Sequence, residues 1–269
     1  MSRVEATFAK LRGERRKALV AFASVGDPSI AVSIDVLRAC VAAGADILEL
    51  GVPFSDPIAD GPVIARAGAR ALAAGSSLAR VLDVARELRR TSDAPLVLFS
   101  YFNPIYTYGP TRLATDARAA GIDALLVVDL PPEEGNDLRA AAVAEGLAMI
   151  PLLSPTTTDA RAKATLSGAT GFVYYVSVTG VTGSGAAPLA DASTAVERLR
   201  AATSLPIVIG FGIDSPEKAR VAAGPASGGA DGVVVGTAIV RAVEQAKSSA
   251  EACAAVTTLL ADIRRALDT

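Results

Sequence analysis

The sequence predicts an α/β fold, a (β/α)8 barrel of the TIM type formed by residues 1–269 as a single domain. Short runs rich in Val, Ile and Leu alternate along the whole chain with Ala-, Arg- and Glu-rich segments of helical periodicity. The runs are apolar at consecutive positions, as in parallel strands that helices cover on both faces. Eight such units suit a closed barrel. A doubly wound open sheet is the alternative, but no Gly-rich dinucleotide-binding turn follows the first strand.

The predicted strands share β-branched residues and leucine, and turn-forming residues flank them. In chain order they are Ala18–Ser24, Asp46–Gly51, Pro95–Ser100, Ala124–Val128, Ala148–Leu152, Phe172–Val176, Pro206–Gly210 and Gly232–Gly236. Segments between them repeat apolar residues at helical spacing, for example Ile30–Ala43, Leu78–Arg90, Glu133–Glu145 and Ser215–Ala223.

Helical periodicity also appears outside these units, at both ends of the chain. Val4–Arg12 precedes the first strand, and Ser249–Leu267 follows the eighth helical segment. We expect the first helix to cap the barrel floor, because an open floor would leave apolar side chains in water. We expect the second to pack on the outer ring of helices. Both are extra helices on one domain.

Composition excludes several classes of protein. The net charge is −2 and basic residues are scattered, which argues against a nucleic-acid-binding face. The sequence contains no run of about 18 uncharged apolar residues, so no membrane span is predicted. Cys40 and Cys253 both lie in Ala-rich helical segments, as small core residues do, and fit a reducing, cytoplasmic setting.

The segment DILELGVPFSDPIADGP, from Asp46 to Pro62, places a glutamate inside an apolar strand. Side chains alternate along a strand, so Glu49 faces the barrel interior if Leu48 and Leu50 face the helices. A buried, unpaired carboxylate is costly and usually takes up a proton. An ion pair with a neighbouring strand is the alternative, but no predicted strand contains Arg or Lys. Glu49 is therefore a catalytic candidate near the strand ends, where barrel active sites lie.

Two aspartates, Asp56 and Asp60, follow in the loop after this strand. Each is either a site residue or a turn or capping residue, because ADGPV can start a helix with Pro62 in its first turn. The spacing leaves both alternatives open. Asp129 is the other acid at a predicted strand end.

Glycine-rich loops follow the last three predicted strands: TGVTGSG, GFGID from Gly210, and GTAIV from Gly236. Glycine lets the backbone approach an anion closely, and a helix N-terminus favours negative charge. Barrel phosphate sites are often built from the loops after the seventh and eighth strands. Each loop alone could simply turn the chain, but three at adjacent strand ends favour a phosphate ligand.

The residue types that are missing narrow the chemistry. The chain has no histidine, which excludes His-ligated metal sites and His-based triads. None of its five lysines ends a predicted strand, which argues against a Schiff-base aldolase. Acid–base chemistry by carboxylates on a phosphorylated substrate remains, with a tyrosine from Val173–Val176 as a possible helper. No metal site is predicted.

The chain resembles the tryptophan synthase alpha chain family, in segments spread from Phe22 to Val240 and in family order. The most specific is LELGVPFSDPIADGPVIARA, with its strand, loop and acids. The other segments are AFASVGDP, FSYFNPIYTYG, GIDALLVVDLPPEE, GFVYYVSVTGVTG, IVIGFGI and GVVVGTAIV.

The resemblance implies a lyase that cleaves indole-3-glycerol phosphate to indole and glyceraldehyde 3-phosphate, without metal or Schiff base. It makes Glu49 the general acid and base, and Asp60 the acceptor of a hydrogen bond from the indole N–H. A desolvated glutamate with a pKa raised toward neutrality suits this task. Tyr174 matches the active-site tyrosine, and the adjacent Tyr175 is the alternative.

Further positions follow from the resemblance alone. The phosphate site would comprise Gly183, Gly212, Gly236 and Thr237. The apolar walls around the indole would comprise Phe22, Phe99, Leu126, Leu153 and Phe211, for which ordinary core packing is the alternative. Thr182 matches a loop threonine that meets the catalytic aspartate. Val178 stands where some members of the family have arginine.

The resemblance also implies a partner, a pyridoxal-phosphate-dependent β subunit in an α2β2 heterotetramer, with no cofactor on this chain. Pro53 and Asp56 lie in the loop that matches the contact with that subunit. Two other functions stay open: a free-standing lyase that releases indole, and a non-catalytic, phosphate-binding allosteric barrel that regulates a β subunit. Intact Glu49 and Asp60 argue against the second.

Overall fold

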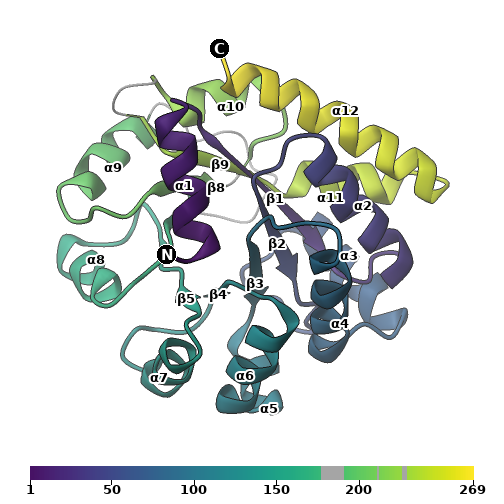
Figure 1. Ribbon diagram of the computed structural model, residues 1–269, viewed down its shortest axis with the longest axis horizontal. Helices are drawn as coiled ribbons and strands as arrows, with labels where there is room; N and C mark the ends of the chain where they lie inside the picture. The colour runs from purple at the N-terminus through teal and green to yellow at the C-terminus, as the bar shows by residue number, and fades with distance from the viewer. Residues whose placement is uncertain (177–190, 211, 226–228) are drawn as a thin grey trace.

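The protein is described by a computed structural model that covers residues 1–176, 191–210, 212–225 and 229–269 (Figure 1). The strands of its sheet are all paired in parallel. They are β1 Ala18–Ser24, β2 Ile47–Gly51, β3 Leu96–Ser100, β4 Ala124–Val127, β5 Ala148–Met149, β6 Leu152–Leu153, β7 Val173–Val176, β8 Ile207–Gly210 and β9 Gly232–Val235. The helices are α1 Arg3–Gly13, α2 Ile30–Ala42, α3 Pro62–Ala73, α4 Leu78–Arg89, α5 Phe102–Tyr108, α6 Pro110–Ala120, α7 Asn136–Ala144, α8 Asp159–Leu166, α9 Asp191–Arg200, α10 Pro216–Ala223, α11 Thr237–Gln245 and α12 Ser249–Leu267.

The predicted (β/α)8 barrel is confirmed, but its fifth strand is divided. The sheet runs β5-β4-β3-β2-β1-β9-β8-β7-β6, and only Ile150 and Pro151 separate its two end strands in the chain. The Ile150 N–H donates to Leu125 on one side, and the Pro151 carbonyl accepts from the Tyr174 N–H on the other. Proline has no N–H to give to a ladder, so the continuous strand Ala148–Leu152 was a wrong prediction. The link of Ile150 and Pro151 therefore closes the barrel between β5 and β6.

Side chains alternate between an interior cluster and an outer cluster of apolar residues. The interior cluster contains Ile47, Phe22 and Tyr174, whereas Leu48 and Leu50 belong to the outer cluster beneath the helices. This is the alternation expected for a strand that is buried on both faces. It confirms the predicted orientation of the strand that carries Glu49.

Helix α1 closes the floor of the barrel, as predicted. Its buried residues Val4, Phe8 and Leu11 belong to the interior cluster. The ring of Phe8 lies 5.6 Å from that of Phe172, which directly precedes β7. A capping box between Ser2 and Glu5 satisfies backbone groups at the start of the helix. The helix thus removes the lower end of the interior from water.

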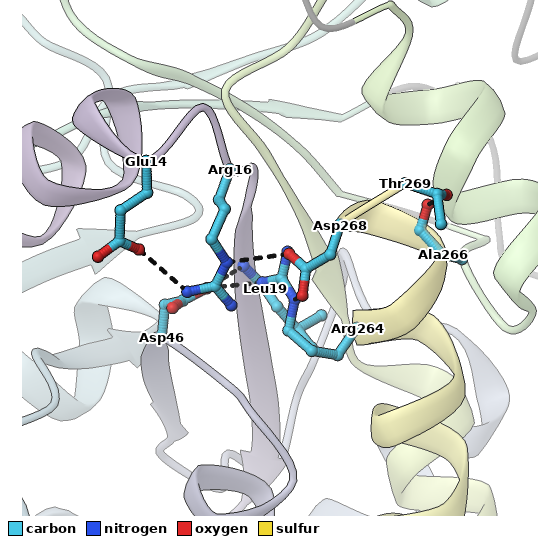
Figure 2. A network of polar contacts seen from close by, with 8 residues as sticks. All are labelled: Glu14, Arg16, Leu19, Asp46, Arg264, Ala266, Asp268 and Thr269. Atoms are coloured by element: carbon cyan, nitrogen blue, oxygen red, sulfur yellow. Dashed lines mark hydrogen bonds and ion pairs between the residues drawn. The ribbon is translucent and has the colours of Figure 1, made fainter.

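Helix α12 packs in the outer ring, between α10 and α2 (Figure 1). It therefore completes the ring, while the shorter α11 packs against α3 and β1 nearer the site. A polar network ties the C-terminal end of α12 to Asp46, which directly precedes β2 (Figure 2). Arg264 Nη1 lies 3.0 Å from Asp46 Oδ2, and its Nη2 lies 2.6 Å from Asp268 Oδ1. The same Asp46 oxygen accepts from the Leu19 N–H at 2.8 Å.

Substitution Arg264→Met should lower the free energy of unfolding by roughly 3 kcal/mol, because it leaves the largely buried Asp46 carboxylate without its ionic partner. Urea unfolding monitored by circular dichroism measures this. The matched control is Arg265→Met on the same helix, whose side chain is 75% exposed and pairs with Asp262. Its effect should stay below about 1 kcal/mol. Equal losses in the two variants would contradict a structural role for the network.

Among the residues that the structure describes, no helix has the length and apolar character that crossing a membrane requires. In the same ranges, no group of three or more His, Cys, Asp or Glu side chains is placed to hold a metal ion.

Candidate active site

A cavity opens at the carboxyl ends of β1, β2 and β3, where barrel active sites lie. Its lining includes Phe22 on β1, Gly51 at the end of β2, Asp60 just before α3, Ile64 in α3, and Phe99 and Tyr101 at the end of β3. Most of the lining side chains are apolar, and Ser24, Asp60, Ser100 and Tyr101 are the polar residues among them.

Glu49 is the third residue of β2, and its side chain is completely buried. In register it stands between Phe22 of β1 and Val97 of β3, both of the interior cluster. Neither carboxylate oxygen has a hydrogen-bond partner in the described part of the chain. Burial raises the pKa of Glu49 to about 8. Such a group can give or take a proton near neutral pH.

Tyr174 reaches the same interior from β7. Its ring lies 6.4 Å from that of Phe99, which in turn lies 5.1 Å from that of Phe22. Burial raises the pKa of the Tyr174 hydroxyl, and the charge of Glu49 adds to the rise. Gly210 on β8 leaves room for it, because a Cβ there would come 2.2 Å from the hydroxyl oxygen. Tyr175 belongs to the outer cluster, so only Tyr174 points into the barrel.

Asp60 precedes Gly61, the N-cap of α3, and its loop is held by Tyr101. The Tyr101 hydroxyl accepts a hydrogen bond from the Ala59 N–H at 2.9 Å. Burial raises the pKa of Asp60, while a hydrogen bond with the same hydroxyl opposes the rise. Tyr101 is only 3% exposed, and its ring packs 5.2 Å from that of Phe54. Asp60 is thus a partly buried acceptor in the cavity, and Tyr101 holds its loop in place.

Sequence reasoning did not single out Tyr101. The available signal was its position, since it directly follows the predicted strand that ends at Ser100. That signal was weak, because a tyrosine at a strand end is also a common packing residue. The role of Tyr101 depends on Asp60, which lies in the loop before α3.

The structure brings only some of the predicted indole-wall residues together in the barrel interior. Phe22, Phe99 and Leu126 lie in or against the interior cluster. Leu153 lies in the outer cluster beside Tyr175, so its assignment to the wall was wrong. Its neighbour Leu152, paired with Tyr174, packs against the interior cluster. The break at the fifth strand shifts which residue faces inward.

Three of the four phosphate candidates, Gly212, Gly236 and Thr237, follow the ends of β8 and β9. Gly236 is the N-cap of α11, and Thr237 is its first residue. A Cβ on Gly236 would lie 3.4 Å from Phe22, so this helix begins beside the aromatic wall. Gly212 has a φ of +72°, a backbone conformation that favours glycine. Thr182, Gly183, Phe211 and Val178 lie outside the described residues.

The other acids near the strand ends have different surroundings. Asp56 is exposed and accepts a hydrogen bond from the Ser55 hydroxyl at 2.5 Å, while the nearby Pro53 is buried and lines the cavity. Asp129 is exposed and accepts from the Phe102 N–H at 2.7 Å, at the start of α5. Asp129 therefore serves as a helix cap.

The raised pKa of Glu49 predicts that folding stability falls as pH rises. Between pH 4.5 and about 8, folded Glu49 keeps a proton that the unfolded chain has released. The free energy of unfolding should therefore decrease across this window and level off above it. In Glu49→Gln this contribution disappears, so the variant should be more stable than wild type at pH 8 by a few kcal/mol. Urea unfolding at several pH values checks this, and parallel pH profiles for the two proteins would refute it.

Residues 8–267 match the family model described as tryptophan synthase alpha chain. The chain is also similar to tryptophan synthase subunit alpha from Legionella pneumophila str. Paris, with 38% identity, a TM-score of 0.91, and coverage of 100% of this chain and 99% of that chain. A ligand-free tryptophan synthase structure from Mycobacterium tuberculosis gives 31% identity and a TM-score of 0.89, with 100% of both chains covered. A second structure from that organism gives 33% identity and a TM-score of 0.90, covering 100% of this chain and 99% of that chain.

Proposed function

Since the chain belongs to the tryptophan synthase alpha chain family, whose known activity is cleavage of indole-3-glycerol phosphate, we propose that its own carboxylates carry out this cleavage. The products are indole and glyceraldehyde 3-phosphate, and the pathway is tryptophan biosynthesis. The observation that carries the proposal is Glu49, a completely buried carboxyl group inside the barrel whose pKa is raised to about 8.

Glu49 moves the protons of the reaction. It gives a proton to indole C3, which turns the ring into a protonated indolenine with positive charge on the ring nitrogen. It then takes the proton of the hydroxyl group on the carbon attached to C3. As the O–H electrons form the aldehyde carbonyl, the carbon–carbon bond breaks and its electrons return to the indole ring. One proton is given and one is taken, so the carboxyl group ends in its starting state.

Asp60 accepts a hydrogen bond from the indole N–H and so stabilises positive charge on the ring nitrogen. The Tyr101 hydroxyl, which binds the Ala59 N–H, keeps this carboxylate in place. Tyr174 faces the same interior as Phe99 and Glu49 and contacts the reacting part of the substrate. Phe22, Phe99, Leu126 and Leu152 enclose the indole ring.

The phosphate group binds at the other end of the substrate. Gly236 and Thr237 offer backbone N–H groups and a hydroxyl at the start of α11, where the helix dipole favours an anion. Gly212 contributes a close backbone approach from the end of β8. The predicted donor Gly183 and the loop threonine Thr182 complete this part of the proposal.

Membership of the family implies a β-subunit partner. We place the contact on the loop that contains Pro53 and Asp56, where Ile58 is 84% exposed. The partner would carry pyridoxal phosphate and join indole to serine in an α2β2 complex in the cytoplasm. The chemistry proposed for this chain needs no cofactor of its own.

Indole release from indole-3-glycerol phosphate tests the proposal, measured for the purified chain alone and with a β subunit. We expect slow release that rises strongly when the β subunit is present. Fast release without it would favour a free-standing lyase. No release in either condition by the folded chain would leave the non-catalytic barrel. A Glu49→Gln preparation made in parallel shows how much release comes from contaminating host enzyme.

A further inference from the structure

Four charged residues join α3 to α11 and to the loop after β1. We name Asp27, Arg66, Arg70 and Glu244 the α3–α11 cluster. Arg70 Nε and Nη2 donate to the two carboxylate oxygens of Asp27 at 2.7 and 2.8 Å, and its Nη1 donates to Glu244 at 2.7 Å. Arg66 donates to both oxygens of Glu244 at 2.8 and 2.9 Å. One guanidinium therefore holds two acids from elements that are far apart in the chain.

The hydrogen bonds of the α3–α11 cluster make it rigid. Asp27 is only 5% exposed, and its two carboxylate oxygens accept from Nε and Nη2 on one side of the Arg70 guanidinium. The two arginines lower the pKa of Glu244 to about 2, so it stays charged at any working pH. The guanidinium group is planar, and bidentate bonds to carboxylates fix orientation as well as distance.

Two neighbouring faces of helix α3 make different contacts, one with the cavity and one with α11. Ile64, Ala65 and Gly68 line the cavity, and Asp60 stands just before the first turn. Arg66 and Arg70, one turn apart, face α11. The cluster therefore connects the helix that carries this part of the cavity wall to α11.

Helix α11 leads from the cluster to the phosphate end of the site. Glu244 lies near its C-terminal end, and Gly236 and Thr237 form its start. Phe22 adjoins both ends of the substrate site, since it lines the cavity with Asp60 and lies beside Gly236. A tilt of α11 relative to α3 would thus change the separation of Asp60 from the phosphate-binding backbone.

We propose that Arg70 is a positioning residue that sets the spacing between the Asp60 end and the phosphate end of the substrate site. The inference rests on the proposed function, because it assumes one substrate that spans both ends. Misplacement of a bound substrate by about 1 Å can lower its rate roughly 100-fold, so a rigid tie between the two ends has a direct use. Arg70 itself need not touch the substrate.

Three variants separate this role from general stability. Arg70→Gln removes both links, and Glu244→Gln weakens the link to α11 while the Arg70–Asp27 pair stays. Arg38→Gln is the matched control: its side chain is 39% exposed and pairs with Glu87 between α2 and α4, away from the site. For each protein, calorimetry or NMR titration measures the affinity for inorganic phosphate, for indole, and for indole linked to phosphate through a saturated propyl chain. Indole release gives kcat and KM.

We expect Arg70→Gln to bind inorganic phosphate and indole separately as wild type does, but to bind the linked ligand about 10-fold more weakly and to lose about 10- to 100-fold in kcat/KM. Glu244→Gln should show the same pattern in weaker form, and it carries the test if Arg70→Gln does not fold. The proposal is overturned if the linked ligand binds to the folded variants as it does to Arg38→Gln. It is also overturned if the separate fragments weaken as much as the linked ligand. Absence of indole release by wild type and Arg38→Gln would instead count against the proposed function.

Discussion

Substitution Glu49→Gln should lower kcat for indole release by about 1,000-fold or more, while the linked indole–phosphate ligand binds with nearly the wild-type affinity. Glutamine has almost the same shape as glutamate, so the fully buried site keeps its packing. Its carboxamide cannot exchange a proton with indole C3 or with the substrate hydroxyl group. Steady-state kinetics in the presence of a β subunit and calorimetry with the linked ligand measure the two quantities.

The matched control is Asp56→Asn, which neutralises an exposed acid a few residues further along the chain. It should leave kcat for the chain alone near the wild-type value, although it can change activation by the β subunit. Near-normal turnover in Glu49→Gln would remove Glu49 from the mechanism. Equal losses of turnover and ligand affinity would indicate a damaged site rather than a missing proton carrier.

Substitution Asp60→Asn should lower kcat/KM by about 100-fold, which is the second largest effect. The carboxamide oxygen can still accept a hydrogen bond from the indole N–H. It carries no negative charge, however, so it does not stabilise the positive ring nitrogen that forms when C3 is protonated. Steady-state kinetics measure this loss. Wild-type kcat/KM in Asp60→Asn would show that the aspartate is only a loop residue before α3.

Substitution Tyr101→Phe tests how Asp60 is held, with a smaller loss of about 10-fold in kcat/KM. The ring keeps its packing against Phe54, but the loop loses its bond from the Ala59 N–H. The hydroxyl also holds down the pKa of Asp60, so its removal should raise that pKa. Because Asp60 acts when ionised, the acidic limb of the pH–rate profile should move to higher pH. An unshifted limb would argue against this contact.

Much of the fold and the principal site residue followed from local patterns. Consecutive apolar positions with turn residues between them predicted parallel strands, and period-two alternation pointed Glu49 inward. The same reasoning failed at the fifth strand, where Pro151 interrupts the ladder and Leu152, rather than Leu153, faces the interior. The alternation of side chains between the interior and the outer face predicts their direction only while the strand is continuous.

Contacts between distant residues were beyond that reasoning. Arg70 lies 43 positions from Asp27 and 174 from Glu244, and nothing in the local sequence pairs them. The link between Tyr101 and the loop at Asp60 likewise joins two different strand ends. Such pairs follow from how helices and loops pack around the barrel.

The amino-acid sequence alone establishes that an acid stands in an apolar strand, that no histidine is available, and that glycine-rich loops follow the last strands. These are local properties, because side-chain direction and turn chemistry depend on near neighbours in the chain. The packing of the folded chain, in contrast, leaves Glu49 without a hydrogen-bond partner among the described residues and raises its pKa to about 8. Desolvation is a sum over everything packed around a group, and for Glu49 those neighbours come from strands far apart in the sequence.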